Sequence, residues 1–124
     1  MRLTFTDREL DVMAVLWQRG PSTVAEVRDR LTDDLAHNTV QTVLRVLEEK
    51  GYVSHTEQGK AHCFRARVKP ELAGVRAASR IVEKMFGGST ERLLTHLVAE
   101  RDVPADELRR LRDLLDEKLK EAGR

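Results

Sequence analysis

The sequence predicts a mainly α-helical chain with one small β-hairpin, an α+β fold class. Apolar residues recur every three to four positions from residue 6 to residue 51 and again from residue 70 onward, the spacing of amphipathic helices. Between these stretches the residues alternate with a period of two, which is typical of strands. With 124 residues, 40% hydrophobic and 35% charged, the chain suffices for one domain or two very small ones. This length excludes most enzyme architectures.

Capping boxes mark the start of the first two predicted helices. Thr6 with Glu9, and Thr23 with Glu26, can each satisfy free backbone N–H groups of a first helical turn. The first helix ends at Gly20-Pro21, because glycine suits the residue after a helix and proline cannot continue one. The second runs from about residue 24 to residue 31. The side chains expected to face the core are Leu10, Met13, Ala14 and Trp17 in the first helix and Val24, Val27 and Leu31 in the second.

A third helix follows the polar turn at residues 32–34 and ends at Gly51. Its apolar face consists of Val40, Val43, Leu44 and Leu47. Two strands, at residues 52–56 and 61–67, then form a hairpin around a turn that contains Gly59.

Three more helices are predicted after the hairpin. The first begins at Pro70 and ends at Gly87-Gly88, the second has Ser89 as its N-cap, and the third opens at Pro104. The side chains expected to face inward from the first of them are Leu72, Val75, Ala78, Val82, Met85 and Phe86.

This order of elements is that of a winged helix-turn-helix, in which the third helix enters the DNA major groove and the hairpin lies along the phosphates. We therefore expect a DNA-binding domain at residues 1–69 and a helical dimerisation domain at residues 70–124.

The charge distribution favours the same assignment. The net charge of the chain is only +1, but residues 1–34 carry a net −2 and residues 35–69 a net +3, and residues 58–69 contain no acid. A basic stretch on a small domain is typical of nucleic-acid binders.

The candidate DNA-binding residues lie on the exposed face of the third helix and on the hairpin. Amide, imidazole and guanidinium groups can read base edges, and lysine or arginine can bind phosphate. The candidates are His37, Asn38, Thr39, Gln41, Thr42, Arg45, Lys60, His62 and Arg65.

Leucines on the last two helices are too many to be buried within about 50 residues. We expect a second copy of the chain to cover them, and a two-fold dimer would bind an inverted-repeat operator in double-stranded DNA. The expected interface residues are Leu93, Leu94, Leu97, Val98, Leu108, Leu111, Leu115 and Leu119.

Three segments of the chain, residues 10–17, 20–27 and 38–53, resemble the penicillinase-repressor (BlaI/MecI/CopY) family, and so do Phe86-Gly87-Gly88-Ser89 and the helix from Glu107 to Leu115. The resemblance implies a dimeric winged-helix transcriptional repressor from a family of antibiotic-resistance regulators. It also implies relief of repression through cleavage triggered by a membrane-bound sensor protease. The family's cleavage bond aligns with His96-Leu97, which differs from the Asn-Phe of the best-known members.

Two alternatives to a DNA-binding repressor remain at this point. One is a winged helix that binds an acidic protein partner, and the other is a metal- or redox-responsive regulator built on His55, His62 and Cys63. The single cysteine cannot form an internal disulfide or supply a multi-thiolate metal site. No catalytic motif, metal site or cofactor is predicted, so the chain is not expected to be an enzyme. No signal segment or membrane-spanning run is apparent, and we expect a cytoplasmic protein that does not bind membranes.

Overall fold

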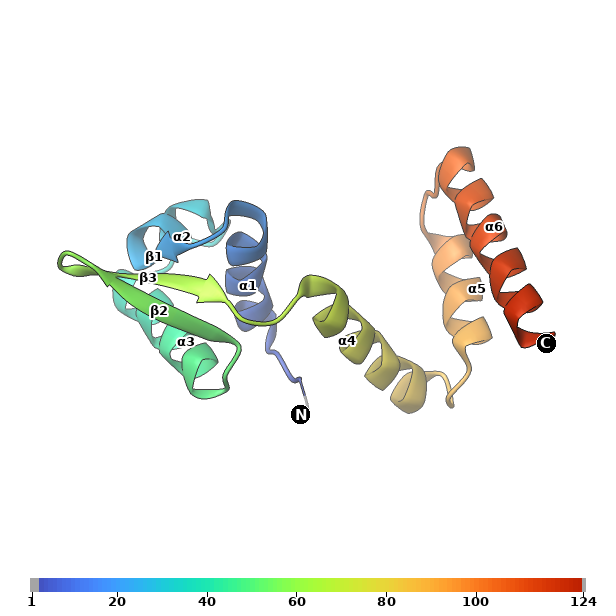
Figure 1. Cartoon of the computed structure of the whole chain (residues 1–124), viewed down its shortest axis with the longest axis horizontal. Helices are drawn as coiled ribbons and strands as arrows, with labels where there is room; N and C mark the ends of the chain where they lie inside the picture. The colour runs from blue at the N-terminus through green and yellow to red at the C-terminus, as the bar shows by residue number, and fades with distance from the viewer. Residues whose placement is uncertain (1–2, 124) are drawn as a thin grey trace. The chain divides into compact units, whose positions relative to one another are not determined.

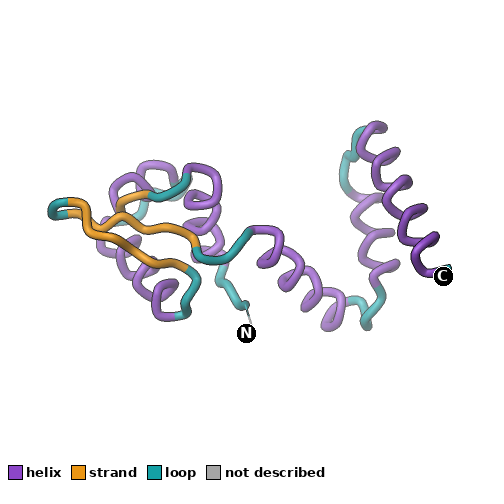
Figure 2. Tube along the Cα trace, viewed as in Figure 1, coloured by secondary structure: helices purple, strands orange, loops and turns teal. Residues whose placement is uncertain are grey.

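The computed structural model describes residues 3–123 and has the expected mainly helical architecture with a small sheet (Figures 1 and 2). Along the chain the elements are α1 (Asp7–Arg19), β1 (Ser22–Thr23), α2 (Val24–Arg30), α3 (His37–Glu49), β2 (Val53–Gln58), β3 (Ala61–Ala66), α4 (Pro70–Met85), α5 (Thr90–Glu100) and α6 (Ala105–Ala122). The predicted fold class is confirmed.

Local hydrogen bonds explain where the first helices begin and end. Both capping boxes are formed, with Thr6 and Glu9 at the start of α1 and Thr23 and Glu26 at the start of α2. By contrast, α3 has Ala36 as its N-cap and no side-chain cap. The turn after α3 uses Gly51 at φ 84°, a left-handed conformation that other residues rarely adopt.

The sheet has three strands in the order β1-β3-β2, all antiparallel. The sequence predicted the β2–β3 hairpin but not β1, which pairs Ser22 with Phe64 and Thr23 with Cys63. A strand of two residues is too short to show a period of two. Its pairing with Cys63 and Phe64 places the middle of β3 beside the start of α2. We call the β2–β3 hairpin the wing.

The core lies where α1, α2 and α3 pack against the sheet. The buried side chains include Val12, Met13, Leu16, Val27, Val40, Leu44, Leu47, Tyr52 and Phe64. The face expected for α3 is correct, since Val43 packs against the same cluster. The face expected for α1 is wrong in part, because Leu10 is exposed and Trp17 is only partly buried, while Val12, Val15 and Leu16 are buried. Trp17 instead donates a hydrogen bond from Nε1 to the carbonyl oxygen of Val68, at 2.9 Å.

One carboxylate is buried in this unit. The side chain of Glu9 is 6% exposed and accepts hydrogen bonds from Lys50 Nζ at 3.0 and 2.9 Å and from the Thr6 backbone N–H at 2.7 Å. Burial raises the pKa of Glu9, but the hydrogen bonds from Lys50 and Thr6 together bring this pKa below its ordinary value. The ion pair therefore links Glu9, in the first turn of α1, to Lys50, the residue that follows α3.

The chain divides into two compact units, the first through Ser79 and the second from Arg80. This division falls inside α4, ten residues beyond the domain boundary expected at 69/70, and the domain assignment itself stays a prediction.

In the second unit Ser89 caps α5 as predicted, by accepting a hydrogen bond from the Arg92 N–H. No residue of α5 or α6 is buried. On α4 the expected inward face is wrong at Leu72, Val75, Ala78 and Met85, which are exposed, whereas Val82 is buried. Among residues 3–123, no helix is long and apolar enough to cross a membrane.

Candidate nucleic-acid interface

The outer face of α3 carries exposed polar side chains. His37, Asn38, Thr42 and Arg45 are exposed. The Thr42 hydroxyl donates to the backbone carbonyl of Asn38 at 2.8 Å, which holds its side chain against the helix. In the described part of the chain, the Arg45 guanidinium makes no hydrogen bond or ion pair. The exposed polar groups that could contact base edges thus lie on one helix, and among them the Thr42 hydroxyl is bonded to the α3 backbone.

A cavity of about 260 Å³ separates α3 from the wing. We call it the wing–helix cavity, and the residues that line it are Thr23, Val24, Ala25, His37, Gln41, Lys60, Ala61, His62 and Phe64. It brings together four of the predicted DNA-binding residues, two from α3 and two from the wing. In Figure 1 the hairpin runs alongside α3 and its tip extends beyond the helices, as a strand pair that follows a DNA backbone would.

The start of α2 contributes to this cavity, and sequence reasoning missed it. Thr23 and Ala25 line the wing–helix cavity although neither was a candidate. The capping box at Thr23 marked the start of the helix before α3, and helix starts are frequent neighbours of phosphate. Glu26, one turn into α2, carries a negative charge that the adjacent Arg19 offsets. The backbone hydrogen bond from Thr23 lowers its pKa below the ordinary value, with Arg19 contributing, and Arg19 forms an ion pair with it.

Arg65 lies apart from the other candidates. It lines a different pocket together with Trp17, Pro21 and Lys69. Because side chains alternate along β3, His62 and Arg65 point to opposite faces of the strand. Any contact that Arg65 makes with DNA would come from another edge of the wing.

The wing is tied to α3 by histidine contacts that the sequence did not predict. His55 Nδ1 lies 2.5 Å from Glu48 Oε2, at the far end of α3. The His55 and His62 rings are stacked, with centroids 4.4 Å apart and an angle of 11° between their planes. The period-two pattern placed both histidines in strands, but only the pairing register could show that they meet.

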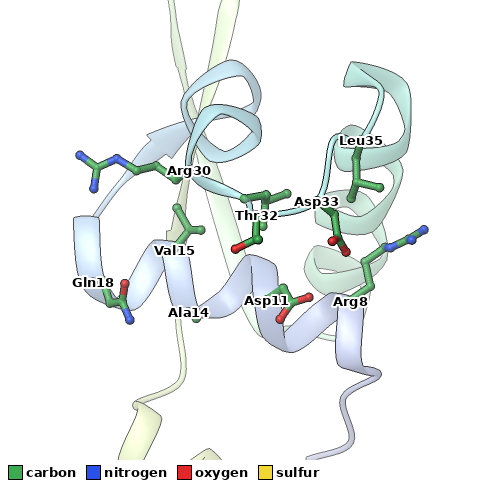
Figure 3. Close-up of a pocket in the computed structure, with 10 residues that line it drawn as sticks. Arg8, Asp11, Ala14, Val15, Gln18, Arg30, Thr32, Asp33 and Leu35 are labelled. Carbon is green, nitrogen blue, oxygen red and sulfur yellow. The ribbon is translucent and has the colours of Figure 1, made fainter.

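A second cavity, also of about 260 Å³, lies between α1 and the loop that joins α2 to α3. Figure 3 shows Thr32 and Asp33 pointing from this loop toward α1, which contributes Arg8, Asp11 and Gln18. None of the predicted DNA-binding residues lines it. Its rim mixes cations and anions, so it has no net attraction for a polyanion.

The predicted interface residues lie on the exposed leucine-rich surface of α5 and α6. Leu94, Leu97, Val98 and Leu108 are 39 to 43% exposed, and Leu115 and Leu119 are 53% and 69% exposed. Leu93 and Leu111 are partly buried.

The residues of the expected cleavage bond, His96 and Leu97, lie within α5. The His96 ring contacts Phe86, with centroids 5.8 Å apart. A protease binds its substrate as an extended chain, so cleavage at this bond would require local unwinding of α5.

The chain matches the model of the penicillinase repressor family over residues 5–117. It is similar to the methicillin resistance regulatory protein MecI of Staphylococcus aureus, with 20% identity over 89% of this chain and 91% of that protein. It is also similar to the penicillinase repressor of Bacillus licheniformis, with 24% identity over 90% of this chain and 89% of that protein.

Solved structures show the same fold. A MarR family protein from Bacillus stearothermophilus matches with a TM-score of 0.51 and 18% identity over 98% of this chain and 78% of its own. A transcriptional regulator from Thermotoga maritima matches with the same TM-score and identity over 93% and 79%. At this identity the likeness concerns the winged-helix architecture alone.

Proposed function

Because the chain belongs to the penicillinase repressor family, a family of DNA-binding transcriptional repressors and not of enzymes, we propose that it represses transcription by binding an inverted-repeat operator in double-stranded DNA. The observation that carries the proposal is the wing–helix cavity. It gathers His37 and Gln41 from α3 and Lys60 and His62 from the wing around one space.

These side chains have separate roles in the proposal. Arg45, Asn38 and Gln41 can form paired hydrogen bonds with guanine or adenine, and the methyl groups of Thr39 and Thr42 can contact thymine. Lys60, His37 and His62 surround the space that a backbone phosphate would fill, and Arg65 contacts phosphate from the other face of β3.

We also propose that the functional form is a homodimer, held by the leucines of α5 and α6. No residue of these helices is buried within the chain. Leucine side chains that are 39 to 69% exposed gain about 25 cal/mol for each Å² that a partner covers. A second copy of the chain is the partner proposed to cover these leucines. The resulting two-fold dimer would bind two half-sites related by the same symmetry, which is the arrangement of an inverted-repeat operator.

An inducing signal is proposed to relieve repression in the cytoplasm. Cleavage between His96 and Leu97 by a membrane-bound sensor protease is the route to test first, because severing α5 would separate α6 from the rest of the chain. Mass spectrometry of the protein from induced cells should then find a fragment that ends at His96. If induction occurs while the chain stays intact, this route is refuted, and the proposal that the chain binds DNA is not affected.

The proposal is tested by fluorescence anisotropy with an operator selected from a random-sequence DNA pool. Replacing Arg45 by Ala should cost about 1–3 kcal/mol and relax specificity at one position of each half-site. Replacing Lys60 by Ala should weaken binding to all sequences and reduce the salt slope by about one. Arg8→Ala is the matched control, because Arg8 lines the other cavity and has no ion partner in the described part of the chain.

The outcome separates the candidate functions. If no DNA sequence is enriched and no DNA binds at low salt, a protein-interaction role for the wing is favoured instead. If metal ions or oxidants abolish binding in a way that depends on Cys63, a sensor role is favoured.

A further inference from the structure

The wing contains two imidazole rings in direct contact. His55 of β2 and His62 of β3 are diagonal neighbours, because the strand register pairs His55 with Phe64 and Glu57 with His62. Their rings stack at 4.4 Å, and both also contact the Phe64 ring, at 5.4 and 6.4 Å. Two parallel imidazolium rings at this distance would repel each other, so a proton on one ring disfavours a second proton on the other.

Charged groups reach this histidine pair from each neighbouring element. From α3, Glu48 lies 2.5 Å from His55, and from β2, Glu57 Oε1 lies 3.9 Å from His62 Nε2. His37 and Lys60 line the wing–helix cavity with His62. Thr23 of β1 and the two residues that α2 contributes to the cavity, Val24 and Ala25, are uncharged. Thus Glu48 is within hydrogen-bond distance of His55, whereas Glu57 lies 3.9 Å from His62, beyond that distance, and His62, with 47% of its side chain exposed, faces the space proposed for a phosphate.

We propose that a DNA phosphate enters the wing–helix cavity together with one proton, which the His55–His62 pair takes up from solvent. The inference rests on the proposed function. A phosphate is a fixed negative charge beside His62, and an opposite charge within a few ångströms favours the protonated imidazole. No other group is consumed, because the proton comes from water and returns to it when the DNA dissociates.

The coupling between proton uptake and DNA binding determines how the affinity for DNA changes with pH. Because the complex holds more protons than the free protein and free DNA, affinity must rise as pH falls through the range in which imidazoles titrate. If DNA binding makes the proton about tenfold more tightly held, affinity rises roughly fourfold between pH 7.5 and pH 6.0. Carboxylates ordinarily titrate below this range and lysine above it.

The experiment uses the full-length chain and a fluorescein-labelled duplex of about 30 base pairs, roughly three helical turns, recovered from a random-sequence pool by binding to this chain. Anisotropy titrations at pH 7.5 and 6.0 and constant ionic strength give the change in affinity. Calorimetry in two buffers of different ionisation enthalpy gives the protons taken up, which the same tenfold change puts at about one half per chain near pH 7. His62→Gln should remove both the rise in affinity and the proton uptake.

Two variants serve as matched controls. His37→Gln removes the other imidazole of the cavity and should keep the rise. Lys60→Gln should weaken binding at both pH values by the same factor. The inference is overturned if wild-type affinity does not change with pH, if the rise survives His62→Gln, or if His37→Gln alone abolishes it. Failure to recover any duplex would instead refute the proposed function, and this inference with it.

Discussion

Replacing Lys50 by Met tests whether the buried Glu9 is held in place by its ion pair. The side chain of Glu9 is 6% exposed, and Lys50 is the only described partner of its Oε2. The Met side chain fills similar space but leaves that oxygen charged and unpaired, while Oε1 keeps the Thr6 N–H.

The expected loss follows from this geometry. Breaking a fully buried ion pair costs about 3–5 kcal/mol, but Lys50 is one-third exposed and water can partly replace it, so we expect about 2 kcal/mol. Glu9→Gln keeps an acceptor for Thr6 and should cost only about 1 kcal/mol. The double variant buries no unpaired charge and should cost about 1.5 kcal/mol, which leaves a coupling energy of about 1.5 kcal/mol.

Urea unfolding monitored by the single tryptophan measures these values, because Trp17 lies in the first unit and reports its unfolding. If the two substitutions are additive to within about 0.3 kcal/mol, the ion pair does not hold Glu9 and the reasoning is refuted.

Acid titration gives a second readout of the same pair. The pKa of Glu9 is lower in the folded protein than its ordinary value of 4.5, so the folded state is stabilised above that pH. This contribution is lost as the pH falls through the folded pKa. The difference in unfolding free energy between the wild type and Glu9→Gln should therefore be constant near neutral pH and shrink below pH 4.5.

Two further substitutions test the core and the dimer. Leu44→Ala, at a fully buried position of α3, should reduce the unfolding free energy by about 2.5–5 kcal/mol in the same urea assay, and a loss below about 1 kcal/mol would contradict the packing described. Leu115→Glu should convert the dimer to a monomer in sedimentation velocity without changing the Trp17 transition. Arg110→Glu, exposed on the opposite side of α6 by helical spacing, should leave the dimer intact, and a dimer that survives Leu115→Glu would refute the proposed interface.

The sequence predicted the helix limits well because local signals determine them. Capping boxes at Thr6 and Thr23 and a glycine after α3 each act within a few residues. The buried face of α1 was less predictable, since apolar residues occupy most of positions 10–17 and the partners that select one face lie far along the chain. Glu9 is the clearest case, because its burial depends on Lys50, 41 residues away.

In the candidate site too, features determined by local patterns were predictable, whereas contacts between elements were not. Helical spacing put Asn38, Thr42 and Arg45 on the outside of α3 without knowledge of the fold. The contacts between elements were missed, among them the stack of His55 on His62, because these depend on strand register and on how the wing packs against α3.

The most direct test of the account compares two titrations of the full-length chain, one with the operator selected from random-sequence DNA and one with a scrambled duplex of equal length. Specific binders at physiological salt typically prefer their site by about 10³-fold or more. We predict a preference of at least that order, which Arg45→Ala reduces and Arg8→Ala does not. Equal affinity of the wild type for both duplexes would contradict the claim that this chain is a sequence-specific repressor.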